Sequence, residues 1–372
     1  MIHVNYQNDK ELQRWYAGQI RASRKKPSPM PGSIRRELRG LKESLSSLSP
    51  QAFEDILLKK RPLLEKTYAW IEEYGKLCDF VAYYPLLKEQ AQKSRFYWDY
   101  PKLRQDYLGQ YKGFYLESLI DGLSSSPDEL IRSWANFNRL KKAAHQCLEE
   151  ANLLIREFFD YSMMSQETRH ELFRKMDVPV CPYCNRQYIH TVSLAGKEPY
   201  LGDLDHFYPQ SFYQLFSLSL WNLIPVCKPC NQLFKRQYNK KLLSPQEEGF
   251  DDDCVLEITA HEAAALLGYK DTFTVHWKIS PFAPAKKAEK IRQNLELFHL
   301  DDVYQYHKPH IQRILQKRYL HSKSYSEKLN RMLEQIPLSE EEKNHLIYGA
   351  SLDKSQFHKE LLGKMTYDIV IR

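Results

Sequence analysis

The stretch CPYCNRQYIHTVSLAGKEPYLGDLDHFYPQSFYQLFSLSLWNLIPVCKPC, residues 181–230, decides the fold of this chain. One C-x2-C pair opens it and another closes it, so four cysteines are available to bind one metal ion. They are Cys181, Cys184, Cys227 and Cys230. Two such knuckles can hold a single Zn²⁺ in a tetrahedron of thiolates, with metal–sulfur bonds of about 2.3 Å. Because four cysteines fill every position of that tetrahedron, the spacing predicts a structural zinc that ties the intervening residues together.

Length and composition limit the class of protein. The chain has 372 residues, of which 42% are hydrophobic and 27% charged, as in ordinary globular proteins. The formal net charge of +7 permits a nucleic-acid partner without requiring one. No apolar run reaches the roughly 18 residues of a membrane span, and the first residues lack the apolar core of a signal peptide. We therefore expect a cytoplasmic protein, in which paired cysteines bind metal rather than form disulfides.

Three regions differ in their sequence pattern. Residues 1–175 have apolar side chains at helical spacing, interrupted near residues 21–40 by a basic, proline-containing segment that is either a solvated linker or a phosphate-contacting arm. Residues 176–245 lose the helical period and contain the four cysteines. Residues 246–372 return mainly to helix, with a short strand predicted at residues 272–280. The sequence thus predicts a mainly α-helical protein with a small, zinc-stapled α+β module at its centre.

Within the module, the pattern predicts two strands and a helix. RQYIHTV and YLGDLDHF read as the strands of a β-hairpin joined by the turn SLAGKEP, and PCNQLFKRQYN reads as a short helix with Pro229 in its first turn. Asp205 and His206 are adjacent, and neighbouring side chains on a strand point to opposite faces. We expect the strand to end at His206, so that both side chains turn toward the helix. Asn231 and Lys235 lie four residues apart and should share one face of that helix.

These residues resemble a known family. LDHFYPQSF followed by WNLIPVCKPCNQLFK resembles the HNH endonucleases, whose module has the ββα-metal fold, and the two C-x2-C pairs resemble their zinc-bearing subgroup. DH-x-x-P-Q-S-F and the step from Asn222 to Asn231 resemble the HNH domain of the large CRISPR effector nuclease. The longer phrase is similar to HNH nucleases of bacterial anti-phage defence, of the Septu and retron-associated type. The resemblance covers residues 181–240 and leaves the helical flanks unexplained.

The resemblance implies a catalytic site. His206 would take a proton from the attacking water, and Asn222 would brace the loop and orient His206. Asp205 and Asn231 offer oxygen ligands, which suit Mg²⁺ or Mn²⁺ better than zinc. Asn231 stands where many members of the family have histidine. The divalent ion would act as a Lewis acid at the scissile phosphate.

A basic stretch follows the second knuckle. Between Cys227 and Ser244 there are five lysines and arginines and no acidic residue. They are Lys228, Lys235, Arg236, Lys240 and Lys241. Such a run predicts a surface that faces phosphates, with Lys235 at the phosphate and Lys228 and Arg236 as further substrate-binding residues.

Three functions stay open on this reading. The first is an HNH endonuclease that cuts DNA, the second is an HNH-type nuclease that cuts RNA such as tRNA, and the third is a zinc-ribbon module that binds nucleic acid or protein without cleaving. Hydrolysis by a metal and water does not need the 2′-hydroxyl, so the site residues do not distinguish DNA from RNA. By analogy with the defence nucleases, the helical flanks would engage a regulatory ATPase.

Overall fold

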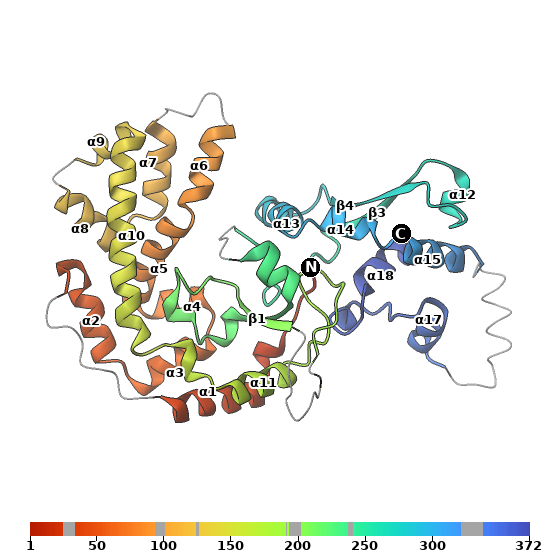
Figure 1. The fold of residues 1–372 in the computed structure, drawn as a ribbon, viewed down its shortest axis with the longest axis horizontal. Coiled ribbons are helices and arrows are strands. Elements are labelled where there is room, and N and C mark those ends of the chain that lie inside the picture. Colours follow the sequence, from red (N-terminus) through yellow and green to blue (C-terminus); the bar gives the residue numbers. More distant parts are fainter. Residues whose placement is uncertain are drawn as a thin grey trace.

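The computed structural model describes residues 1–24, 34–93, 101–123, 126–190, 192, 202–236, 241–320 and 338–372. Over these residues the chain is mainly helical and contains two small antiparallel sheets of two strands each. Figure 1 shows helices at both ends of the molecule with the short strand β1 between them. The predicted class, mainly α-helical with a small α+β part, is confirmed at this level.

The first region is a stack of helices arranged around the long helix α10 (Figure 1). Ser133 caps α10 by accepting a hydrogen bond from the backbone N–H of Asn136, and Ser126 caps α9 in the same way, as its Ser-Pro-Asp sequence predicts. The apolar stripe of α10 packs against α5 and α8. The helices are α1 (Lys10–Ser23), α2 (Arg39–Ser46), α3 (Pro50–Leu58), α4 (Arg61–Thr67), α5 (Ala69–Ala82), α6 (Tyr84–Lys93), α7 (Pro101–Gln110), α8 (Phe114–Gly122), α9 (Pro127–Arg132), α10 (Trp134–Arg156) and α11 (Gln166–Lys175).

The basic segment at residues 21–40 is only partly the linker that the sequence predicts. Helix α1 enters it from one side, and a 3₁₀ turn followed by α2 enters it from the other. Arg35 forms an ion pair of 2.8 Å with Glu150 of α10, so this part of the segment is tied to the helical stack. One of the basic residues of this segment therefore has an acidic partner within the chain. Residues 25–33 lie outside the described residues.

The central module consists of two strands and one helical turn. Strands β1 (Gly202–His206) and β2 (Leu223–Cys227) pair in antiparallel register, with His206 opposite Leu223. The helix Pro229–Lys235 follows one residue after β2 and is a π-helix, in which the backbone N–H of Arg236 donates to the carbonyl of Asn231 over 2.8 Å. The predicted helix is confirmed, and its widened turn is a feature that is frequent at functional sites.

The predicted β-hairpin is wrong in its pairing. Strand β1 pairs with β2, and in the described part of the first predicted strand Tyr188 makes only an isolated bridge to Val180. The reason is apolar burial, because every residue of β2 is buried whereas Tyr188 is 52% exposed. The predicted turn at residues 193–199 lies outside the described residues.

The last region combines a second sheet with helices. Strands β3 (Cys254–Ala260) and β4 (Phe273–Ile279) are antiparallel, which confirms the strand predicted at residues 272–280. Helix α14 packs on β4, and α18 packs on β3 and α15. The helices are α12 (Ala263–Leu266), α13 (Ala285–Leu297), α14 (Leu300–Gln305), α15 (Lys308–Leu320), α17 (Glu340–Tyr348) and α18 (Gly363–Ile371). The apolar spacing of residues 310–336 predicts a helix that continues past α15, and the part after residue 320 lies outside the described residues.

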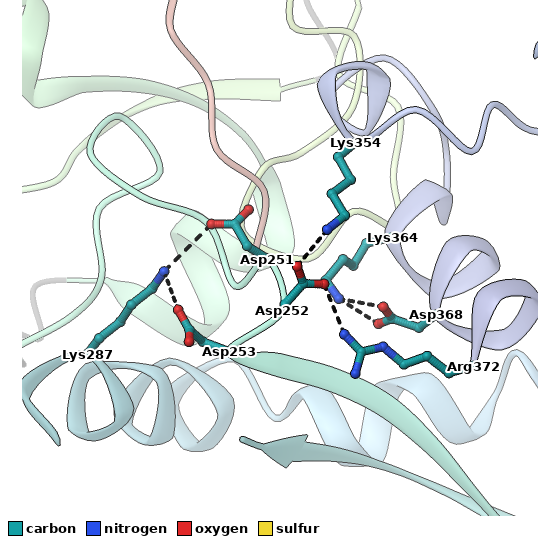
Figure 2. A network of polar contacts seen from close by, with 8 residues as sticks. All are labelled: Asp251, Asp252, Asp253, Lys287, Lys354, Lys364, Asp368 and Arg372. Atoms are coloured by element: carbon teal, nitrogen blue, oxygen red, sulfur yellow. Dashed lines mark hydrogen bonds and ion pairs between the residues drawn. The ribbon is translucent and has the colours of Figure 1, made fainter. Parts of the chain in front are cut away.

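The acidic sequence DDD before β3 joins this region together (Figure 2). The carboxylate of Asp252 lies 2.6 Å from Nζ of Lys354 and 2.9 Å from the guanidinium of Arg372 at the chain end. Asp253 lies 2.7 Å from Nζ of Lys287 in α13. Each of these carboxylates thus has a cationic partner from another segment, so the acidic run works as an internal brace.

A buried ion pair lies within α18, and its carboxylate also contacts the second sheet (Figure 2). Nζ of Lys364 lies 2.7 Å from both carboxylate oxygens of Asp368, and Asp368 also accepts a hydrogen bond from the backbone N–H of Leu256 in β3. Burial lowers the pKa of Lys364 and raises the pKa of Asp368. The two groups therefore depend on each other, and removing either one would leave an unpaired group in the interior.

One hydrophobic core runs through all three regions. Its buried side chains include Phe137 of α10, Leu223 of β2 and Trp277 of β4. The central module is therefore held between the helical flanks by apolar contacts as well as by its cysteines. Among the helices that the structure describes, none combines the length and the apolar composition needed to cross a membrane.

Candidate functional site

The four predicted metal-binding cysteines come together. Their sulfur atoms all lie within 4.8 Å of one another, all four side chains are buried, and Sγ of Cys184 is 3.9 Å from Sγ of Cys227. A tetrahedron with metal–sulfur bonds of about 2.3 Å has sulfur–sulfur separations of about 3.8 Å. The cluster therefore fits a tetrahedral ion such as zinc, and it closes the module between the first knuckle and the end of β2.

The first knuckle also touches the predicted catalytic carboxylate. The hydroxyl of Tyr183, between the two cysteines, donates a hydrogen bond of 2.6 Å to Oδ2 of Asp205. Tyr183 is fully buried and stacks on Phe298, with 4.6 Å between ring centroids. Its hydroxyl links the cysteine cluster to the end of β1. Only the folded structure shows this contact, because the two residues are 22 positions apart in the sequence.

Asp205 is almost completely buried and has a cationic partner. Nζ of Lys235 lies 3.0 Å from Oδ1 of Asp205 and donates a second hydrogen bond of 2.7 Å to the backbone carbonyl of His206. The Lys235 side chain is 0% exposed. The prediction that Lys235 faces a phosphate is therefore wrong, because its charge is used inside the protein to balance a carboxylate that would otherwise be buried alone.

Asn231 is oriented by Asp203, which is not among the predicted site residues. Its amide nitrogen donates to Oδ2 of Asp203 over 3.0 Å, and Gln232 donates to the same oxygen over 2.8 Å. Asp203 lies two residues before Asp205, on the same face of β1, and the π-helix covers this face. Asn231 and Lys235 thus reach the same strand, as their spacing predicts. The period of two in GDLDH was the signal that could have identified Asp203.

His206 closes β1. Its Nε2 lies 2.9 Å from the carbonyl oxygen of Ser217, and its ring meets the ring of Tyr161 edge to face at 4.8 Å. Because a carbonyl can only accept, Nε2 carries the proton in this bond and Nδ1 is left with a lone pair. Burial lowers the pKa of His206 below its ordinary value. Strand β1 ends at His206, as expected, and the imidazole lines the same cavity as Asn231 of the following helix.

Asn222 holds the loop that follows His206. Its Oδ1 accepts from the backbone N–H of Tyr208 at 2.6 Å, and its amide nitrogen donates to the carbonyls of Tyr208 and Phe216. Its own backbone carbonyl accepts from Phe207. The side chain is 1% exposed. Asn222 therefore braces the loop, as predicted, and does so from the interior without facing the cavity described next.

A cavity of about 380 Å³ lies beside the end of β1. We call it the His206 cavity. It brings together Asp205, His206, Asn231 and Arg236 from the sequence prediction, whereas Lys228 is exposed elsewhere on the module. Its other lining residues are Arg156, Leu204, Pro209, Gln210 and Ser211. Arg236 has a backbone φ of +46°, an uncommon and strained value for a side chain of this size.

The donor chemistry of the cavity fits a hard cation. Asp205 gives one lone pair of each oxygen to Tyr183 and Lys235, and an ionised carboxylate has about four such positions. The bond from its amide nitrogen to Asp203 leaves Oδ1 of Asn231 available. Two oxygens, one of them charged, suit Mg²⁺ or Mn²⁺. Among the described residues the cysteines form the one set of three or more His, Cys, Asp or Glu ligands.

Comparisons of the chain with protein-family models, with curated proteins and with solved structures found no match.

Proposed function

We propose that this chain is a metal-dependent endonuclease of the HNH type, which hydrolyses phosphodiester bonds in nucleic acid and most readily in DNA. The observation that carries the proposal is the setting of His206. Its Nε2 is held by Ser217, its Nδ1 is left as an acceptor, and the ring lines a cavity shared with Asp205, Asn231 and Arg236. A neutral, fixed imidazole beside oxygen ligands and an arginine suits general-base hydrolysis of a phosphate ester.

Each residue of the cavity would have a separate role in the reaction. Nδ1 of His206 takes a proton from the attacking water, and the hydrogen bond to Ser217 keeps the ring from turning. Arg236 contacts the phosphate at the mouth of the cavity. Asp205 and Asn231 would hold Mg²⁺ or Mn²⁺, which supplies Lewis-acid stabilisation of the leaving oxygen when bound. The cysteine cluster would hold zinc as a structural ion, because it has no open position.

Strand, strand and helix in this order support the ββα-metal assignment. Strand β1 carries Asp205 and His206 at its end, β2 leads into the second knuckle, and the π-helix returns Asn231 to β1. Asn222 is buried because the loop between the two strands needs its backbone groups satisfied.

The test compares cleavage of labelled duplex DNA, single-stranded DNA and tRNA by the wild type, His206→Ala and His190→Ala. His190 is an exposed histidine of the same module and makes a matched control. We expect cleavage in Mg²⁺ or Mn²⁺, a loss of about 10²–10⁴-fold in rate for His206→Ala, and little change for His190→Ala. Binding of intact substrate should survive in His206→Ala, because the imidazole is not the anchor of the phosphate.

The substrate arms separate the two nuclease hypotheses. Cleavage of tRNA alone would replace DNA by RNA as the substrate and would leave the roles of the residues unchanged. Equal cleavage by the wild type and His206→Ala on every substrate would contradict the proposal and move the activity to another site or to a contaminant.

One observation favours a second candidate, a zinc-stapled module that binds without cleaving. Both oxygens of Asp205 have protein donors, and Lys235 already balances its charge. Calorimetric titration of Mg²⁺ into the wild type and into Asp205→Asn decides between the two. Binding that Asp205→Asn abolishes supports the nuclease. Absence of binding, combined with a gel shift and no cleavage, supports the binding module.

A further inference from the structure

The His206 cavity has one wall that does not belong to the central module. Arg156 is the last residue of α10, its side chain is exposed, and it lines the cavity together with His206 and Arg236. Resting on the proposed nuclease function, we infer that Arg156 binds a phosphate of the nucleic-acid backbone at the cleavage site. The helical flank that the HNH resemblance leaves unexplained would then supply part of the substrate site.

Arg156 is held in place relative to the cavity. One turn earlier on α10, the amide nitrogen of Asn152 donates to the carbonyl of Ser211, a residue of the cavity rim, over 3.1 Å. The hydroxyl of Tyr74 in α5 donates to Oδ1 of the same Asn152 over 2.7 Å, which fixes the amide. These hydrogen bonds connect the end of α10 to the rim of the cavity. They therefore fix the position of the Arg156 backbone relative to the cavity.

The chain after α10 is tied to the same site. The carbonyl of Phe159 accepts hydrogen bonds from Gln214 over 2.6 Å and from Ser217 over 2.7 Å, and Ser217 in turn holds the imidazole of His206. Tyr161 packs against the His206 ring. The first region thus positions the imidazole of His206 through Phe159 and Tyr161, and it also places Arg156 in the cavity lining. The same short segment after and at the end of α10 therefore serves both residues.

The charges of the cavity favour an anion. Asp205 is the acidic lining residue, and the buried ammonium of Lys235 balances it. Two guanidinium groups, Arg156 and Arg236, are then left with no carboxylate in the lining to neutralise them. Within the part of the chain that the structure describes, no ion pair holds Arg156. A guanidinium fork offers parallel N–H donors that match two phosphate oxygens, which a lysine cannot reproduce.

A structural role gives a different expectation. An arginine in the last turn of a helix interacts favourably with the partial negative charge of the helix end, whatever its place near a cavity. Replacement would then lower stability slightly and leave substrate affinity unchanged. Substrate affinity measured beside thermal unfolding therefore separates the two roles.

The experiment compares Arg156→Ala, Arg156→Lys and Arg139→Ala on the full chain. Arg139 is an exposed arginine of the same helix, 17 residues earlier and about 25 Å away along its axis, and it does not line the cavity. Both alanine variants remove one positive charge, so nonspecific attraction to nucleic acid is matched. We measure kcat/KM on a labelled duplex with Mg²⁺, binding of the same duplex by fluorescence anisotropy, and the unfolding temperature.

We expect Arg156→Ala to lower kcat/KM by about 10- to 100-fold, as loss of a charge-assisted hydrogen bond does, and Arg156→Lys to recover only part of it. Arg139→Ala should stay within about two-fold of the wild type. A wild type that cuts while Arg156→Ala behaves like Arg139→Ala overturns the role of Arg156 and leaves the nuclease proposal standing. The role of Arg156 is also overturned if Arg156→Ala loses activity only in proportion to a lower unfolding temperature and Arg156→Lys restores that activity in full.

The inference is also testable if the proposed function fails. Should the wild type bind duplex DNA without cutting it, weaker binding by Arg156→Ala than by Arg139→Ala supports a phosphate contact at the cavity, and equal binding overturns it. A wild type that neither cuts nor binds DNA or tRNA overturns the function and the inference together.

Discussion

Asp205 and His206 follow each other in the sequence, and both line the cavity, but the folded chain separates their hydrogen-bond partners. Asp205 is buried between Tyr183 and Lys235, whereas His206 faces Ser217 and the cavity. Strand alternation accounts for the separation, because β1 keeps its register up to His206. A buried carboxylate with fixed donors can hold its orientation, and a partly exposed imidazole can reach water.

The hydroxyl of Tyr183 permits a prediction at this scale. In Tyr183→Phe, Asp205 loses one of its two side-chain donors, and a hydrogen bond to a charged group contributes about 1.5–3 kcal/mol. We expect the free energy of unfolding to fall by that amount, with zinc retained and nuclease activity reduced. Urea unfolding, metal content and cleavage rate measure the three effects.

Tyr304→Phe is the matched control for this substitution. It removes an equally buried hydroxyl that donates to the carbonyl of Cys184 in the same knuckle, over 2.8 Å. That bond is between neutral groups, so we expect little effect on cleavage. Equal losses of cleavage in both variants would show that the knuckle, and not the contact with Asp205, limits activity.

At the scale of elements, the cysteine cluster joins the first knuckle to the end of β2. A structural zinc in a small module supplies much of its folding free energy, apparently about 10–16 kcal/mol in isolated zinc fingers. We expect Cys227→Ser to lose zinc, to unfold residues 181–236 locally and to abolish cleavage. Metal analysis by mass spectrometry and limited proteolysis of this segment measure the outcome.

Cys147 gives the control for the cysteine experiment. It is buried in α10, away from the cluster, and Cys147→Ser should keep full zinc content. Full zinc and normal cleavage in Cys227→Ser would refute the assignment of the four cysteines as ligands.

Another contact between elements predicts a pH dependence. Nε of Arg186, after the first knuckle, donates to Nε2 of His307 before α15, over 2.9 Å. Burial and the charges of Arg186 and His310 lower the pKa of His307 to about 4. An unfolded histidine has a pKa of about 6.5, so between pH 6.5 and 4 the unfolded chain takes up a proton that the folded chain does not. His307 should therefore reduce stability as the pH falls through this window.

His307→Gln should remove that part of the pH dependence. One proton contributes at most about 1.4 kcal/mol per pH unit, and less here because the side chain is only partly buried. The measurement is the difference between urea midpoints at pH 7 and pH 4.5, for the wild type, His307→Gln and His190→Gln. The same difference in all three proteins would refute this role of His307.

At the scale of the whole molecule, Asn185 connects the cysteine cluster to the last segment of the chain. It follows Cys184, and its amide nitrogen donates to the carbonyls of Phe357 and Glu360, both over 2.9 Å. Its Oδ1 accepts from the backbone N–H of Lys364. Its φ of +52° lies in the left-handed region, which asparagine tolerates better than most residues. The knuckle thereby holds the segment that leads into α18.

Two substitutions separate the side-chain contacts of Asn185 from its backbone conformation. Asn185→Gly loses the contacts but accepts the positive φ, whereas Asn185→Ala loses the contacts and adds backbone strain of about 1 kcal/mol. In both variants we expect faster hydrogen exchange at Lys364 and its neighbours, and Asn185→Ala should be the less stable. Unchanged exchange in both variants would show that α18 is held by its ion pairs and core contacts alone.

The sequence by itself was enough to predict several features of the fold. The four cysteines, the helix after Pro229, the strand at residues 272–280 and the helical character of both flanks follow from spacing and period. Asp205, His206, Asn222 and Asn231 could be selected because a family motif and the knuckles framed them. These features depend on residues close in sequence or on a fixed ligand spacing, so local physics or chemistry defines them.

Tertiary structure decided the rest. Which strand pairs with β1 depends on how much apolar area each candidate can bury, and only the assembled core fixes that for β2. The role of Lys235 depended on where Asp205 is buried, because a solvated lysine can meet a phosphate but an interior carboxylate requires a counter-charge. Arg156 reaches the cavity, and Tyr161 reaches the His206 ring, across more than forty residues of sequence, through hydrogen bonds and packing that no local period records. Long-range burial and charge balance, which a short motif does not encode, therefore determined how the helical flank and the central module meet at one site.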